Sequence, residues 1–343
     1  MTRRPIRVQG GGRPLVDIFS AGRAGPQSRL HFSRAQIEQI ARTVRRTPEV
    51  MVNVTGGGTS GGAVSAHFGY ISRHGELEIE TDEGERIPKE EQKQFLEDWH
   101  LELTAGQYRA PRDGRQEARK VKLVHKIVLS MPAPTPPEKV LAAARTFARE
   151  KFGAQHRYAM VLHTDQAHPH VHMVVKAEGK DGRRLHIDKE MLREWREDFA
   201  RMMREQGVAA NATPRAARGR NKGSTKDTIY RAQRRGASTA LRDNVASVVK
   251  ELKETGTVRD PARKKLVETR KAVVDGWMRA ADILDRQGEI SLAGDVRYFV
   301  KHLPPVLTER ERIATGIIAR LHAYRARKVD LTVARAANQE LVR

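Results

Sequence analysis

The sequence contains no cysteine among its 343 residues. Disulfide bonds, thiolate metal sites and cysteine nucleophiles are therefore excluded. It also contains no apolar run long enough to span a bilayer, and its arginine-rich first residues lack the apolar core of a secretory signal. We therefore expect a protein that starts in the cytoplasm and does not insert into a membrane.

Aromatic and acidic residues are both scarce. Aromatic residues make up 5% of the chain, which disfavours broad surfaces for stacking nucleic-acid bases. Asp and Glu number 42 against 64 Lys and Arg, giving a formal net charge of +22. This charge would attract a polyanion from a distance, although it does not distinguish DNA from RNA or from acidic membranes.

Four histidines lie in the ten residues from His163 to His172. His170 and His172 begin an expected strand that runs to Val175, so their side chains share one face at roughly 7 Å separation. An expected strand from Tyr158 to His163 would fold back beside it and add a third imidazole. Three neutral imidazoles suit a divalent ion that grips an anionic phosphodiester. The alternative, a closed structural zinc site, is disfavoured by the absence of cysteine.

A glycine-rich segment, 55–62, precedes an expected helix over 63–73 that presents Tyr70. Glycines free backbone N–H groups for close approach of phosphate, and a tyrosine oxygen can form a covalent phosphodiester. The phenol titrates near pH 10, so it needs a metal ion or a neighbouring base to react at neutral pH. A flexible loop followed by an ordinary packed tyrosine is the alternative interpretation.

Further motifs follow these two in order along the chain, and the recognisable sequence runs from 52 to 223. They are Tyr70 to Arg73, Glu76 to Glu80, His125 to Pro132, the histidine segment with its His-Val-His core at 170–172, and 185–207. In these motifs the chain resembles the relaxases of the MobA/VirD2 type, DNA-strand transferases that start conjugative plasmid transfer.

The resemblance implies an α/β (α+β) fold in which a central antiparallel sheet is flanked by helices. It implies Tyr70 as the nucleophile and a metal site with three ligands, namely His163, His170 and His172. His168 is an additional histidine in this motif that could replace His163 as a ligand or contact DNA instead. Asp165 is expected to orient a ligating imidazole, with acceptance of the Tyr70 proton as the alternative. Lys176 stands where relatives often carry asparagine.

The implied reaction is site- and strand-specific nicking and religation at the transfer origin of a plasmid or integrative element. It proceeds by metal-assisted transesterification through a 5′-phosphotyrosine. The expected cofactor is Mg²⁺ or Mn²⁺, although imidazole ligands also suit Zn²⁺ or Ni²⁺. The alternatives are a catalytically silent origin-binding protein, or a rolling-circle replication initiator or transposase of the same superfamily.

The expected partners are single-stranded DNA at the nick, flanking duplex DNA, accessory proteins of the nicking complex and the coupling protein of a type IV secretion channel. Export with the transferred strand is also expected. The first fifty residues carry ten arginines against three acidic residues, and the run 211–235 carries eight basic residues against one acidic residue. The candidate DNA contacts are Arg73, Lys126, Ser130, His168, Arg215, Arg218, Arg220 and Lys222.

The sequence divides into four expected regions. These are a basic N-terminal arm (1–50), a catalytic domain (51–210), a basic DNA-binding linker (211–235) and a helical accessory domain (236–343). In addition to the strands at the histidines, the patterns predict strands at 122–129 and 185–187. They predict helices at 36–46, 88–104, 138–152, 189–206, 239–254, 261–287, 291–301 and 308–331.

Overall fold

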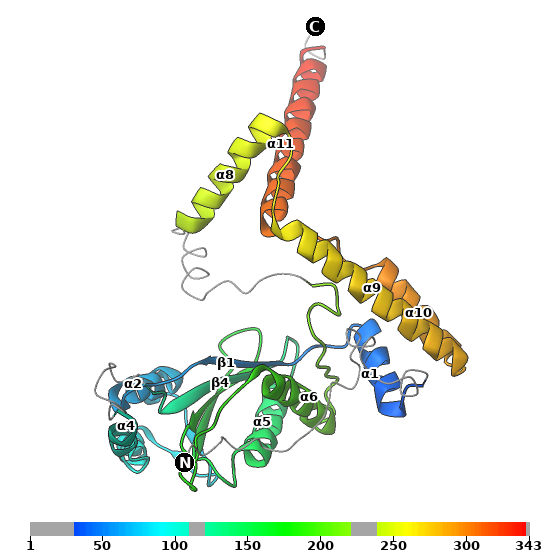
Figure 1. Cartoon of the computed structure of the whole chain (residues 1–343). Coiled ribbons are helices and arrows are strands. Elements are labelled where there is room, and N and C mark those ends of the chain that lie inside the picture. Colours follow the sequence, from blue (N-terminus) through cyan, green and yellow to red (C-terminus); the bar gives the residue numbers. More distant parts are fainter. Residues whose placement is uncertain (1–30, 110–120, 221–238, 341–343) are drawn as a thin grey trace, which may run out of the picture. The chain divides into compact units, whose positions relative to one another are not determined.

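The computed structural model describes residues 31–109, 121–220 and 239–340. Its contacts divide the chain into two compact units (Figure 1). Among the described residues, the first unit comprises 32–213, and the second comprises His31 and the residues from Pro214 onward. Within these ranges, no helix combines the length and apolar character that crossing a membrane requires.

The first unit is built on one six-stranded antiparallel sheet with the order β1-β4-β6-β5-β2-β3. The strands are β1 (Met51–Gly56), β2 (Ile79–Thr81), β3 (Arg86–Ile87), β4 (Val124–Ser130), β5 (Tyr158–His163) and β6 (His170–Lys176). Helices lie on both faces of the sheet, and further helices follow towards the C-terminus. The expected fold class is therefore confirmed.

The strands β5 and β6 form as their runs of apolar residues predict. β6 buries Val171 and Met173 on one face and Val174 on the other. The link 164–169 reverses the chain, so that β5 and β6 pair in antiparallel register and place His163 directly opposite His170. Because residues opposite one another in such a pair share a face, the histidines of both strands point to the same side.

One face of the sheet is covered by α5 (Pro137–Lys151) and α6 (Lys189–Glu205). α5 has proline at its first position, and the Asp188 side chain caps α6 by accepting from the Met191 N–H at 2.8 Å. Phe147 of α5 meets Trp195 and Phe199 of α6 edge to face. This core supports the sheet from behind the histidines.

The other face is covered only in part, by α2 (Gly61–Ile71), α3 (Gln92–Glu97) and α4 (Leu101–Arg109). Phe68, Phe95 and Trp99 form a buried cluster with ring centroids 5.5–6.4 Å apart. The prediction of one helix over 88–104 was wrong, because the chain forms a short 3-10 helix, η3 (Lys89–Glu91), and then two α-helices. His100 lies between α3 and α4 with a φ of 48°, a left-handed conformation that ends a helix.

The predicted strand at 185–187 was also wrong. The Leu185 N–H donates to the Ala177 carbonyl at 2.7 Å, and only an isolated bridge joins Glu178 and Arg184. The segment itself pairs with no strand and has no regular secondary structure. The segment also contacts His125, whose Nε2 lies 3.1 Å from the Leu185 carbonyl oxygen, and its Leu185 and Ile187 side chains pack against the core.

The helix α1 (Arg34–Val44) opens the first unit and begins with a capping box between Ser33 and Gln36. Its buried Thr43 accepts a hydrogen bond from the side-chain amide of Asn211 at 3.1 Å. The 3-10 turn η2 (Arg73–Gly75) follows α2. The bond between Thr43 and Asn211 joins α1 to the last residues of the first unit.

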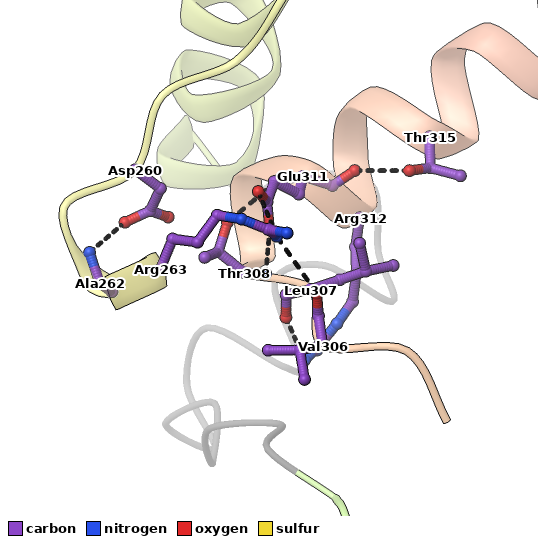
Figure 2. Close-up of polar contacts among 9 residues, drawn as sticks. All are labelled: Asp260, Ala262, Arg263, Val306, Leu307, Thr308, Glu311, Arg312 and Thr315. Atoms are coloured by element: carbon purple, nitrogen blue, oxygen red, sulfur yellow. Dashed lines mark hydrogen bonds and ion pairs between the residues drawn. The ribbon is translucent and has the colours of Figure 1, made fainter. Parts of the chain in front are cut away.

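The second unit is helical, with α8 (Thr239–Thr255), α9 (Ala262–Arg286), α10 (Ile290–Lys301) and α11 (Glu309–Glu340). Trp277 and Phe299 pack α9 against α10, with ring centroids 5.4 Å apart. Figure 2 shows how α9 is joined to the start of α11. Arg263 donates to both carboxylate oxygens of Glu311, and Thr308 caps α11 by accepting from the Glu311 N–H. The expected helical C-terminal region is thus present.

The buried histidine of β4 generates a prediction about stability. His125 is 8% exposed, and burial, only partly offset by its hydrogen bond to Leu185, lowers its pKa to about 4. Between about pH 6.5 and pH 4 the imidazole is therefore protonated in the unfolded chain but still neutral in the native protein. The contribution of the neutral His125 to the free energy of unfolding is present above this range and is lost as the pH falls through it. We expect roughly 2–3 kcal/mol of the decline in unfolding free energy between pH 7 and 4.5 to come from His125.

The measurement is urea unfolding of the metal-free protein at these two pH values, for the wild type and for His125→Gln. The variant lacks the imidazole and should show the smaller decline. Equal declines in the two proteins would contradict the prediction.

Candidate active site

Three imidazoles meet on the face of the sheet that carries α2. His163 comes from the end of β5, whereas His170 and His172 come from β6. Their ring centroids lie 4.5–5.1 Å apart, and one nitrogen from each ring lies within 4.8 Å of the others. These side chains could hold a metal ion.

Backbone carbonyls determine which nitrogen two of the imidazoles offer. His163 Nε2 lies 2.6 Å from the carbonyl oxygen of Ile71, and His170 Nδ1 lies 3.0 Å from that of His168. A carbonyl accepts only from a protonated nitrogen, so His163 Nδ1 and His170 Nε2 keep their lone pairs. Backbone carbonyls commonly orient metal-binding histidines in this way, so the donor set fits a divalent cation.

The protonation state of the cluster also fits a cation. Burial, followed by the neighbouring His163 and His170, lowers the pKa of His172 to about 3. Burial likewise lowers the pKa of His163, which is 1% exposed. Both rings are therefore neutral at physiological pH, which is the form that binds metals.

Tyr70 lies near the C-terminal end of α2. Ser60 caps this helix by accepting from the Ala63 N–H, and Val64, Phe68 and Ile71 form its buried side. Tyr70 is on the opposite side and is 46% exposed. The contact between Ile71 and His163 fixes the end of α2 against the histidines.

His67 connects Tyr70 with the cluster. Its ring stacks on Tyr70 at 6.2 Å, one turn away on α2, and meets His172 edge to face at 6.5 Å. Burial, followed by the charge of Lys126, lowers the pKa of His67 to about 4. Sequence reasoning missed this residue, although its position three residues before Tyr70 on a helix was a usable signal.

Arg73 and Asp165 form an ion pair beside the tyrosine. The guanidinium of Arg73 lies 2.5 Å from an Asp165 carboxylate oxygen, and it stands 5.7 Å from the centre of the Tyr70 ring. The other Asp165 oxygen is 3.8 Å from His163 Nδ1, which is longer than a hydrogen bond. The group that orients His163 in this structure is thus Ile71, while Asp165 orients Arg73. The roles predicted for Asp165 and Arg73 stay predictions.

The other candidates of the first unit take different positions. Lys126 lies on the same sheet face, and burial lowers its pKa. The buried hydroxyl of Ser130 donates to the Pro169 carbonyl at 3.2 Å, directly beside His170 in the sheet. His168 Nδ1 accepts from the Ala133 N–H at 3.0 Å, and this ring is not part of the three-histidine cluster.

The basic run after 211 belongs mainly to the second unit. Its turn packs on α9, where Trp277 donates to the Ala217 carbonyl and Arg270 to the Gly219 carbonyl, each at 2.8 Å. Of the candidate DNA contacts, the turn carries Arg215 and Arg220, which are exposed, and Arg218, which is partly buried. Lys222 lies outside the described residues.

The glycine-rich segment contacts the rest of the first unit at two positions, through close packing at Gly57 and a hydrogen bond at Gly61. A Cβ atom at Gly57 would lie 2.6 Å from the Val124 carbonyl oxygen, so only glycine lets this loop approach β4. The Gly61 N–H donates to a carboxylate oxygen of Glu102 at 2.9 Å. One backbone donor that the sequence suggested for phosphate is therefore already bonded to a side chain.

Residues 76–208 match the family model of the relaxase, MobA/VirD2-like nuclease domain. The chain contains a MobA/VirD2-type relaxase domain. It is similar to the T-DNA border endonuclease VirD2 of Rhizobium radiobacter, with 28% identity over 183 residues that cover 48% of this chain and 42% of that protein. The corresponding endonuclease of Rhizobium rhizogenes is 30% identical over 131 residues, which cover 36% of this chain and 29% of the relative.

The endonuclease VirD2 of Agrobacterium fabrum is likewise 28% identical over 183 residues, which cover 48% of this chain and 39% of that protein. The chain thus spans less than half the length of these relatives. The matched segment includes the three histidines and Asp165, while Tyr70 lies just before the segment that matches the family model.

The geometry of the relaxase domain predicts which histidine variants lose metal. His172→Ala should weaken binding of Mn²⁺ by at least about tenfold, because it removes one of three donors. His168→Ala is the matched control and should keep the wild-type affinity, because this ring contacts the Ala133 N–H. Titration calorimetry with Mn²⁺ measures both. Loss of binding in His168→Ala together with retention in His172→Ala would show that the ligand set is different.

Proposed function

We propose that this relaxase domain nicks and religates one DNA strand at the transfer origin of a plasmid or integrative element. The observation that supports this best is the placement of Tyr70 against His67, whose ring in turn meets His172 of the three-histidine cluster. The link between Ile71 and His163 and the ring of His67 together hold the tyrosine near the histidines. A phenol next to a site that can concentrate positive charge suits an attack on a phosphodiester.

The proposed reaction is a transesterification. The Tyr70 oxygen forms a bond to the scissile phosphorus, while the bond from phosphorus to the 3′ oxygen breaks and that oxygen takes up a proton. The product is a 5′-phosphotyrosine, so one phosphodiester replaces another and the strand can later be rejoined by the reverse step. No nucleoside triphosphate is needed, because little free energy is lost.

The residues around Tyr70 have defined tasks in this proposal. The guanidinium of Arg73, held by Asp165, stands near the Tyr70 ring and contacts the phosphate that Tyr70 attacks. Asp165 or a water molecule accepts the phenol proton. A divalent cation held by His163, His170 and His172 would supply positive charge to a non-bridging phosphate oxygen. Mg²⁺ or Mn²⁺ is the proposed ion, and Zn²⁺ or Ni²⁺ would also suit imidazoles.

The net charge of +22 supports a polyanionic partner. We propose that Lys126, Ser130 and His168 contact the strand near the nick, and that the basic run 211–235 contacts flanking DNA. A complex with accessory DNA-binding proteins, and export of the protein with the strand through a type IV secretion channel and its coupling protein, complete the proposal. The proposal also includes the division of the chain into a basic arm, a catalytic domain, a basic linker and a helical accessory domain.

The test is formation of a covalent adduct. The full chain, with Mg²⁺ or Mn²⁺, is incubated with a labelled single-stranded oligonucleotide from the transfer origin of its own element and resolved on a denaturing protein gel. We expect an adduct that a chelator prevents and that Tyr70→Phe reduces by at least about a thousandfold, because phenylalanine has no nucleophilic oxygen.

Tyr298→Phe is the matched control, because Tyr298 is 67% exposed on α10 and the same hydroxyl is removed. It should form the adduct at the wild-type rate. Persistence of the adduct in Tyr70→Phe would identify another nucleophile. Tight binding without any adduct, whatever the metal, would instead favour a catalytically silent origin-binding protein.

A further inference from the structure

The face of the sheet that carries the histidines is only half covered. α2, α3 and α4 cover its far side, where Val161, Val174 and Val124 are buried beneath them. On the described part of this face, β1 contributes no residue to that core, whereas Val50 and Val52 pack on the opposite face. Among the described residues of the first unit, no helix therefore packs over the surface beside the histidines, on β1 and the end of β4.

The sheet register places this surface in line with the histidines. Met51 pairs with Ser130, which pairs with His170, and His170 pairs with His163. In the next row on this face, Asn53 pairs with Val128, and Val128 with His172. Two strand spacings are about 10 Å, so β1 lies within a few nucleotides of any phosphate at the histidines.

We name this surface the β1 strip and define it by Met51, Asn53, Lys126 and Val128. Met51 is 45% exposed and Asn53 is also exposed, while Lys126 and Val128 are partly exposed. The strip contains no carboxylate and has one cation. Val52, which lies between Met51 and Asn53, is fully buried. The exposure of Met51 and Asn53 therefore follows the regular alternation of side chains along a strand, which shows that β1 is packed in the sheet at this point.

The chemistry of the strip suits a single nucleic-acid strand. The amide of Asn53 can donate and accept at a base edge, and the thioether of Met51 adapts to an apolar base face. Lys126 can contact a phosphate. A docked protein would bury little apolar area on this strip, because it has a single aliphatic side chain and one thioether. A DNA strand held at the histidines, in contrast, must continue across a neighbouring surface.

We propose that the β1 strip binds the nucleotides adjoining the scissile phosphate, with Asn53 contacting a base edge. This inference rests on the proposed function and extends it, because it assigns the path of the strand on one side of the cut. It also adds Met51 and Asn53 to the residues that determine which sequence is held. Both side chains are exposed, so their replacement should leave the fold intact.

The absence of cysteine provides a direct test. Asn53→Cys places a single thiol on the strip, and Gln94→Cys places one at an exposed position of α3 as the control. Both are made in a Tyr70→Phe background so that the DNA stays uncut. The rate of maleimide alkylation is measured with and without a saturating single-stranded oligodeoxynucleotide of about 20 mixed nucleotides. We expect the DNA to slow alkylation at least about fivefold for Asn53→Cys and to leave Gln94→Cys unchanged.

A second measurement uses paired charge changes that preserve side-chain shape. Asn53→Asp should weaken binding of the same oligonucleotide about fivefold by fluorescence polarisation, because it sets a carboxylate against the phosphates. Gln94→Glu makes the same change on α3 and should bind as the wild type does. DNA that binds but neither slows alkylation of Asn53→Cys nor responds to Asn53→Asp overturns the inference.

The two proposals fail in different ways. If the Tyr70 adduct forms but the strip variants are indistinguishable from their controls, the strand takes another path and the proposed reaction stands. If the strip is protected but no adduct forms with any metal, the strip is a binding surface of a protein that does not cut. If the wild type binds no single-stranded DNA, both are overturned.

Discussion

The hydrogen bond between His163 and the Ile71 carbonyl is the contact on which the site depends. It joins the end of α2 to the end of β5, two segments 92 residues apart in the chain. The same bond sets the tautomer of His163, so that Nδ1 keeps its lone pair for a cation. One contact therefore places the tyrosine helix and prepares the cation site, and a change at either partner would disturb both.

Part of this arrangement could be predicted from the sequence. Runs of apolar residues predicted β5 and β6, and the spacing of His170 and His172 predicted a shared face. The helices α5, α6 and α8 to α11 followed from their apolar periodicity and caps. These elements are long enough for a periodic pattern to be recognised even where single residues depart from it.

Other parts depended on tertiary contacts that a local pattern cannot show. β2 and β3 have three and two residues, so no alternation identifies them. The break between α3 and α4 arises at His100, where Trp99 turns into the core. In the site, the sequence suggested Tyr70 and the histidines by residue type. It could not show that Asp165 pairs with Arg73 or that His67 bridges Tyr70 and His172, because these contacts depend on where α2 docks.

The unequal covering of the sheet explains how a stable fold keeps an open site. α5 and α6 bury most of one face, with Phe147, Trp195 and Phe199 at its centre, so this face stabilises the sheet largely without help from the other. The histidine face needs α2 only over its far half, and the aromatic cluster under α2 secures that half. Since neither core requires the surface of β1 on the histidine side, that surface is free to carry residues selected for binding, and a polar Asn53 beside a buried Val52 is the result expected.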